Sequence, residues 1–103
     1  MLALSDVLVS FDVASANGAI RVVPYVVSAS DADLGYDLRV FRSGASGTSN
    51  VAQMGRLQLR AGESHAVSTL KVSSVKGDVC KVSITLTQAG RVIRTFSTDC
   101  GTR

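Results

Sequence analysis

The fold is decided by residues 4–28, LSDVLVSFDVASANGAIRVVPYVVS. Apolar and polar residues alternate on both sides of Asn17-Gly18, and this period is typical of strands with one buried face. Asn-Gly is the strongest short signal for a β-hairpin, because both central residues of its two-residue turn need a positive φ. The sequence therefore predicts a strand over about residues 4–14, a tight turn, and a second strand over about residues 19–28.

This turn also fixes the register of the hairpin, because a two-residue loop leaves one way to pair the strands. The pairing brings apolar residues together on one face. The predicted pairs are Val13 with Val22, Phe11 with Pro24 and Val9 with Val26. Pro24 conflicts with a regular strand, because proline has no N–H to donate to a sheet. We expect the second strand either to be disrupted there or to turn the Pro24 nitrogen toward a gap.

Apolar and polar residues alternate in the same way in five further segments. Glycine- and serine-rich stretches separate these segments. These segments span about residues 36–42, 54–60, 66–73, 79–88 and 91–99. Residues 30–35 and 43–50 are predicted loops, and 43–50 the most flexible stretch of the chain. Strands with one apolar face each predict an all-β sandwich of two antiparallel sheets, because each sheet then buries its apolar face on the other. The inward residues expected on segment 66–73 are Ala66, Ser68, Leu70 and Val72.

The 103 residues are 46% hydrophobic and 18% charged, which predicts one globular domain over residues 1–103. No run of 18 apolar residues exists, so we expect no membrane insertion. The apolar start of the chain contains Asp6 and has no basic residue, so it is not a secretion signal itself. We expect a signal peptide to have been removed before residue 1.

Cys80 opens one predicted strand and Cys100 follows the last one. If Ile84 faces Phe96 across the hairpin between these strands, Cys80 faces Cys100 within bridging distance. We expect a disulfide between them, with two unrelated thiols as the alternative. Such a bridge, closing about 20 residues, contributes roughly 3 kcal/mol of stability on the chain-entropy argument. It also indicates an oxidising compartment.

Residues for catalysis and metal binding are scarce. The chain has one histidine, His65, and no cysteine or histidine spacing typical of metal ligands. A catalytic histidine needs a positioned partner, so we interpret His65 as an exposed residue in the turn or at the start of the strand that follows it. No nucleophile elbow or phosphate-binding loop is present. The sequence predicts a protein that is not an enzyme, with no catalytic residues, no metal site and no cofactor.

Charge is distributed unevenly along the chain. Residues 1–37 carry five aspartates against one arginine, whereas residues 38–103 carry ten lysines and arginines against three acidic residues. Four of these cations fall at outward positions of their strands. They share one sheet face if the fourth strand pairs beside the third. They are Arg39, Arg56, Arg60 and Lys81. Arg21 and Lys71 are expected on the other sheet.

Such a basic face fits an ordinary solvated surface, a nucleic-acid site or a docking site for an acidic partner. Phe41 is the one aromatic residue at an outward position among these strands, whereas single-strand binders stack bases on several aromatic residues. We therefore expect no nucleic-acid partner. The solvated surface and the acidic partner both stay open.

Six short motifs between residues 36 and 72 carry a resemblance to a known family. They read YDLRVFRSG at 36–44, GTSN at 47–50, QMG at 53–55, LQL at 57–59, AGE at 61–63 and LKV at 70–72. In spacing and residue type the chain resembles the CsgC/CsgH family of curli amyloid assembly inhibitors over about residues 19–97. It is most similar to the CsgH branch. The C-x-C motif of the CsgC branch is absent, so no redox role is carried over.

The resemblance implies an immunoglobulin-like sandwich of seven strands located in the periplasm. It further implies a chaperone-like activity on an acidic, Gln/Asn-rich curli subunit, the unfolded client, through a basic surface. Arg39, Arg56, Arg60 and Lys81 would form that client-binding face, and we expect the protein to be a monomer. A different class of function stays open, namely a structural or adhesive module of the cell envelope that binds through a strand edge.

Overall fold

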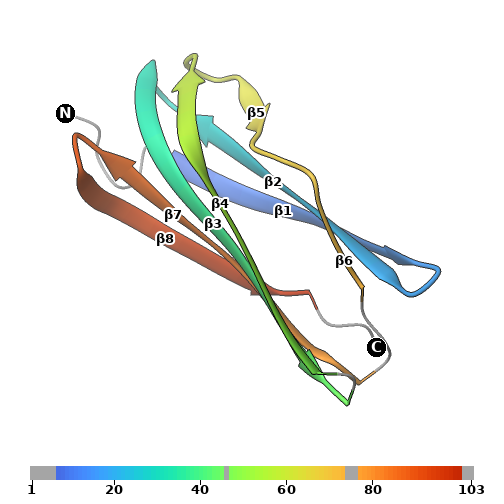
Figure 1. Cartoon of the computed structure of the whole chain (residues 1–103). Coiled ribbons are helices and arrows are strands. Elements are labelled where there is room, and N and C mark those ends of the chain that lie inside the picture. Colours follow the sequence, from blue (N-terminus) through green and yellow to red (C-terminus); the bar gives the residue numbers. More distant parts are fainter. Residues whose placement is uncertain (1–6, 46, 74–76, 101–103) are drawn as a thin grey trace.

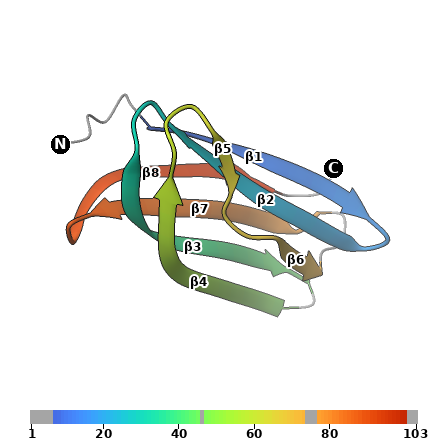
Figure 2. The ribbon, with the colours of Figure 1, turned by 90° about the horizontal axis from the view of Figure 1, so that it is seen from above.

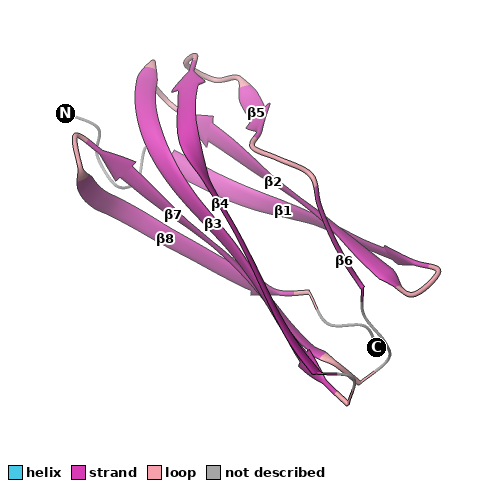
Figure 3. Cartoon of the chain, viewed as in Figure 1, coloured by secondary structure: helices cyan, strands magenta, loops and turns pink. Residues whose placement is uncertain are grey.

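The computed structural model describes residues 7–45, 47–73 and 77–100, and these residues form eight strands and no helix (Figure 3). The strands are β1 (Val7–Ala16), β2 (Ala19–Ser28), β3 (Ala32–Gly44), β4 (Gly47–Leu59), β5 (Ser64–Ala66), β6 (Leu70–Ser73), β7 (Val79–Gln88) and β8 (Arg91–Asp99). The predicted strand start at residues 4–6 lies outside the described residues. Within the described part, no helix is long and apolar enough to cross a membrane.

The strands form two antiparallel sheets that lie as two layers (Figures 1 and 2). In sheet A, β2 pairs with β1 on one side and with both β5 and β6 on the other. Sheet B has the strand order β4-β3-β7-β8. The predicted all-β sandwich is confirmed, with eight strands in place of seven because one predicted strand is split in two.

Alternating side chains of both sheets meet in one hydrophobic core. Its members with no measurable exposure are Val7, Ile20, Val22, Val26, Leu38, Val82, Ile84 and Leu86. They come from both layers, so each sheet covers the apolar face of the other, and burial of this apolar area stabilises the fold. The outward positions carry mostly polar and charged side chains, with a few exposed apolar ones such as Leu8, Met54 and Val92.

The β1–β2 hairpin has the predicted turn and register. Asn17 and Gly18 have φ angles of 53° and 76°, the positive values that this turn requires. Val13 lies opposite Val22, and the other two predicted pairs are present as well. Local turn chemistry and apolar pattern therefore agree with the final structure.

Pro24 faces the gap between β5 and β6. β2 pairs with β5 at residues 25–27 and with β6 at residues 19–22, so no strand pairs with it at Pro24 on that side. The carbonyl of Pro24 accepts a hydrogen bond from the Val67 N–H over 2.9 Å. The missing N–H points toward this same interruption, because the N–H and C=O of a residue in an antiparallel strand share one side. The conflict at Pro24 is thus resolved by a gap, and β2 itself is not disrupted.

The predicted loops around β3 and β4 are wrong. Residues 32–35 belong to β3, because Leu34 is buried opposite Leu57 of β4 and extends the core. β3 and β4 also stay paired as far as Gly44 and Gly47, next to the short turn that joins them. Most of the predicted flexible segment 43–50 is therefore part of the two paired strands. Ser46 lies outside the described residues.

The predicted strand 66–73 is divided into β5 and β6, and its inward positions are only half right. Leu70 and Val72 are buried as expected, but Ala66 is exposed opposite Tyr25. The register against β2 moves by one residue between β5 and β6. A shift of one residue turns every side chain to the other face.

Candidate functional site

The outer face of sheet B holds the cations that the sequence predicts to converge. β4 pairs with β3, which is the arrangement on which the common face depends. Arg39, Arg56 and Lys81 are exposed and alternate with buried neighbours on β3, β4 and β7. Arg60 follows the last residue of β4, in a turn where its carbonyl accepts a hydrogen bond from the Glu63 N–H over 3.1 Å.

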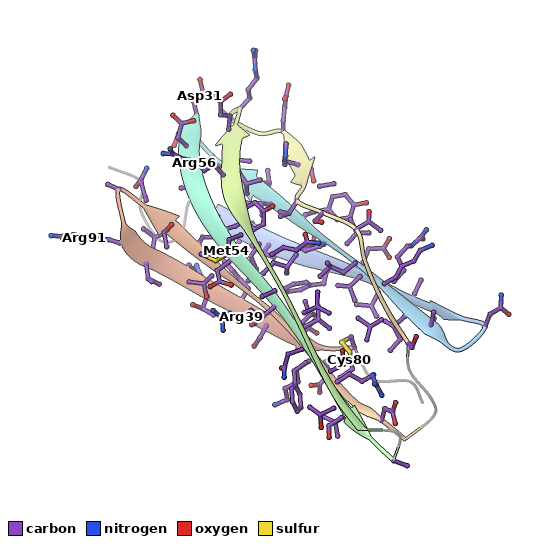
Figure 4. All side chains as sticks on the ribbon, viewed as in Figure 1. Asp31, Arg39, Met54, Arg56, Cys80 and Arg91 are labelled. Atoms are coloured by element: carbon purple, nitrogen blue, oxygen red, sulfur yellow. A yellow bond between two sulfur atoms is a disulfide. The ribbon has the colours of Figure 1, made fainter. Side chains whose placement is uncertain are left out.

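These cations are spread along the face. Arg39 lies opposite Ser83, two residues from Lys81 on β7. Such diagonal neighbours have Cα atoms about 7–8 Å apart. Arg56 lies opposite Gly35, four residues along β3 from Arg39 and therefore roughly 13 Å away. Figure 4 shows Arg56 toward the end of the molecule where Asp31 lies and Arg39 farther along the sheet. The structure thus brings Arg39 and Lys81 together and leaves Arg56 apart.

Carboxylates occupy the same face. Asp37 lies two positions before Arg39 on β3, and Asp99 of β8 lies opposite Lys81. The Arg39 Nε donates to Asp37 Oδ1 over 3.0 Å, and its Nη2 donates to Oδ2 over 3.1 Å. Asp33 is exposed near the start of β3. The outer face of sheet B is therefore of mixed charge with a small positive excess.

The Arg39–Asp37 pair changes how both groups bind protons. The hydrogen bond from Arg39 lowers the pKa of the Asp37 carboxyl, and slight burial opposes this effect. The same hydrogen bond raises the pKa of the Arg39 guanidinium. Both groups stay charged near neutral pH. A partner that binds Arg39 through a carboxylate has to compete with Asp37.

An open hollow lies between Arg39 and Lys81. Arg39, Phe41 and Lys81 line it together with valines and small or polar residues of β3, β4, β7 and β8, and its volume is about 380 Å³. Phe41 is 39% exposed there. Aromatic area between two cations suits an anionic side chain that also carries apolar groups. Sequence reasoning predicted both cations and the outward Phe41 but not the hollow.

The predicted disulfide is confirmed. Cys80 and Cys100 are bonded with Cα atoms 4.8 Å apart, and Ile84 lies opposite Phe96 as expected. The Cys100 N–H also donates to the Cys80 carbonyl over 2.9 Å. The bridge fixes the end of β8 to the start of β7. A structural disulfide is typical of proteins outside the reducing cytoplasm.

His65 lies exposed on the short strand β5, the second of its two expected placements. Within residues 7–45, 47–73 and 77–100, no group of three or more His, Cys, Asp or Glu side chains is placed to hold a metal ion. What the outer face of sheet B offers a partner is the charged groups described above, their hydrogen-bonding atoms and the aromatic ring of Phe41.

Comparison with solved structures identifies the architecture. The solution structure of R. palustris CsgH matches with a TM-score of 0.72 and 18% identity, over 90% of this chain and 91% of that chain. The E. coli curli protein CsgC matches with a TM-score of 0.75 and 19% identity, over 90% of this chain and 96% of that chain. This chain has the CsgC/CsgH fold. The resemblance expected from the sequence is thereby confirmed for the fold.

A similar fold is also found within a larger protein. A Bacteroides fragilis chain described as a β-galactosidase candidate matches with a TM-score of 0.64 and 17% identity, over 92% of this chain but 16% of that chain. No protein-family model matches the sequence, and no curated protein matches it either. The two matches to CsgH and CsgC span nearly whole chains, and the CsgC/CsgH fold is what they show. They do not separate the CsgH branch from the CsgC branch.

Proposed function

We propose that this protein is a chaperone-like inhibitor of curli amyloid nucleation that acts in the periplasm on the unfolded curli subunit. The observation that carries the proposal is the match to the E. coli curli protein CsgC, which spans 96% of that chain. The sequence resemblance between residues 36 and 72 supports the same role. The disulfide between Cys80 and Cys100 supports a location outside the cytoplasm.

Contact with the client is electrostatic and transient in this proposal. Arg56 and Lys81 are exposed and form no salt bridge within the described part of the chain. The Arg39 side chain is 66% exposed in its pair with Asp37. Exposed ion pairs contribute little net stability, so a client carboxylate can replace Asp37. Because aspartates share this face, the attraction is weak and sensitive to salt.

Weak contact is sufficient to delay amyloid formation. A disordered subunit nucleates when β-prone segments of several chains pair edge to edge. Contact that occupies such segments in rare early assemblies removes nuclei without holding every monomer. We therefore expect the delay to occur at inhibitor concentrations well below that of the subunit.

The test is a fibre-growth assay with purified curli subunit and dye fluorescence. The unaltered protein is expected to lengthen the lag phase. A folded variant with Arg39, Arg56, Arg60 and Lys81 all changed to Glu is expected to return the lag to that of the subunit alone. A lag unchanged by the unaltered protein contradicts the proposed function. A lag that stays long with the folded charge-reversed variant contradicts the electrostatic contact.

Two single variants separate position from net charge. Lys81→Glu alters the outer face of sheet B beside the hollow, whereas Arg91→Glu makes the same charge change at the exposed start of β8. We expect the first to shorten the lag more than the second. Equal effects indicate that only the net charge matters.

A structural or adhesive module that binds through a strand edge is the second candidate, and β4 favours it. This strand is an edge of sheet B, with 13 residues of which only Arg56 is charged. Met54 on the same strand is 74% exposed. A long edge with few charges offers unpaired N–H and C=O groups to another strand. High salt distinguishes the two candidates, because it weakens charge-guided contact and spares edge pairing.

A further inference from the structure

The outer face of sheet A carries two cations in direct opposition. β6 pairs with β2 so that Lys71 lies opposite Arg21, and both residues are exposed. Directly opposite residues have Cβ atoms about 4.5–5.5 Å apart, and like charges at such positions repel each other. Core packing requires neither charge, because both positions face solvent. The free protein therefore holds an unfavourable pair on this face.

Carboxylates do not neutralise this pair. Within the part of the chain that the structure describes, neither Arg21 nor Lys71 forms a salt bridge. The strands of sheet A contain one acidic residue, Asp12 of β1. It lies opposite Val23, two positions along β2 from Arg21 on the same face. One carboxylate beside two cations leaves a net positive charge.

Small side chains leave a hollow beside the two cations. Arg21 lies between Lys71 on one side and Ala14 of β1 on the other. Ala19 lies two residues before Arg21 on β2, on the same face. These four residues and Ile20 line a hollow of about 310 Å³. Two of the lining residues are cations and the other three are apolar, so the hollow fits a carboxylate attached to an apolar stem.

We infer that Arg21 and Lys71 form a docking point for carboxylate side chains of an extended acidic peptide segment. The planar guanidinium of Arg21 presents paired N–H donors that match the two oxygens of a carboxylate. Lys71 adds a second charge to the same oxygens. An anion bound here also relieves the repulsion between the two cations. The inference rests on the proposed function, in which that segment belongs to the unfolded client.

The position of this docking point allows one client chain to touch both faces. The described residues span 19 Å in their thinnest dimension. An extended chain covers about 3.3 Å per residue, so at least about six residues are needed to span this thickness. Two weak contacts on one chain reinforce each other through a raised effective concentration. The thin sandwich thus holds a disordered chain briefly at two points.

The test uses a capped peptide that alternates glutamate and valine, with the glutamine analogue as its uncharged control. In NMR titrations of the ¹⁵N-labelled protein at low salt, we expect the amides of Ala14, Arg21 and Lys71 to shift with the glutamate peptide only. The double variant Arg21→Gln, Lys71→Gln is expected to weaken binding by about tenfold, as the loss of a charge-assisted hydrogen bond does. Its spectrum also reports whether it is folded.

Arg91→Glu is the matched control, because it changes the net charge as much as the double variant does but lies on sheet B. We expect it to leave the affinity within about twofold, since Arg91 lies on the other sheet and does not line the hollow. Unchanged affinity in the double variant overturns the inference, as do shifts confined to the face around Lys81. Fibre delay by the unaltered protein would still support the proposed function. Peptide binding through Arg21 and Lys71 without any fibre delay contradicts the proposed function and supports the docking point.

Discussion

Arg42 of β3 donates from Nη1 to Oδ2 of Asp78, 36 positions later in the chain, over 3.2 Å. The two side chains are only 13% and 4% exposed. This pair joins the end of the β3–β4 hairpin to the residue that precedes β7. Gly44 makes the approach possible, because a Cβ at that position would overlap the Asp78 carboxylate.

We expect Asp78→Asn to lower the free energy of unfolding by about 3 kcal/mol, because the largely buried Arg42 guanidinium then loses its counter-charge. Urea denaturation followed by circular dichroism measures the change. Asp37→Asn is the matched control, since its pair with Arg39 is exposed and such pairs contribute little. Equal losses in the two variants contradict the role given to burial.

Removal of the disulfide is expected to cost about 3 kcal/mol, because the bridge restricts the unfolded chain over a separation of 20 residues. The double variant Cys80→Ala, Cys100→Ala and the reduced unaltered protein should unfold at the same lower urea concentration. If both unfold at the same urea concentration, the lost stability comes from the bridge and not from the packing of the two sulfur atoms, which the reduced protein still contains. An unshifted midpoint after complete reduction argues against a stabilising bridge.

The Asp37 carboxyl is expected to titrate below the ordinary aspartate pKa of about 3.9, because Arg39 donates to its charged form. A lowered pKa in the folded state means that this carboxyl stabilises the fold above the unfolded pKa. That stability is lost as the pH falls through the lowered folded pKa. Carboxyl ¹³C NMR titration measures the value directly. Arg39→Gln should return the pKa toward its ordinary value, whereas Arg56→Gln should leave it unchanged.

Lys71→Gln is expected to raise the free energy of unfolding by about 0.2–1 kcal/mol at low salt, because it ends the repulsion with Arg21. The gain should shrink at high salt, where exposed charges are screened. Urea midpoints at two salt concentrations measure it. A loss of stability at low salt, with the spectrum of a folded protein, would show that the two cations do not oppose each other.

Local pairing chemistry explains which parts of the fold were predictable. Asn17-Gly18 and the apolar alternation around it determine both a turn and a register, so the β1–β2 hairpin was predicted residue by residue. Cys80 and Cys100 follow from the same kind of pairing across the last hairpin. In both cases the partners are close in sequence, and one turn fixes them.

Predictions failed where distant contacts decide the structure. Residues 30–35 have a loop-like composition, but burial of Leu34 against β4 extends β3 through most of them. The face of Ala66 depends on a register shift between β5 and β6 that no local pattern signals. Tertiary contacts thus override local propensity at both places.

For the candidate site, outward cations were predictable from strand alternation, but the ion pair between Arg39 and Asp37 was missed. Asp37 and Arg39 are two residues apart on one strand and so share a face, a signal that alternation alone contains. Arg42 shares the phase of Leu38 and Val40, which indicates an inward cation in need of a partner. Its partner Asp78 is far along the chain and depends on the final packing.

The gap at Pro24 also affects how this protein behaves among aggregating chains. Because no strand runs past Pro24 on that side, the outer border of sheet A consists of a three-residue piece and a four-residue piece. Short, interrupted borders give an incoming strand few consecutive backbone partners. One proline thereby protects this side of the molecule from being incorporated into the fibres whose growth it is proposed to delay.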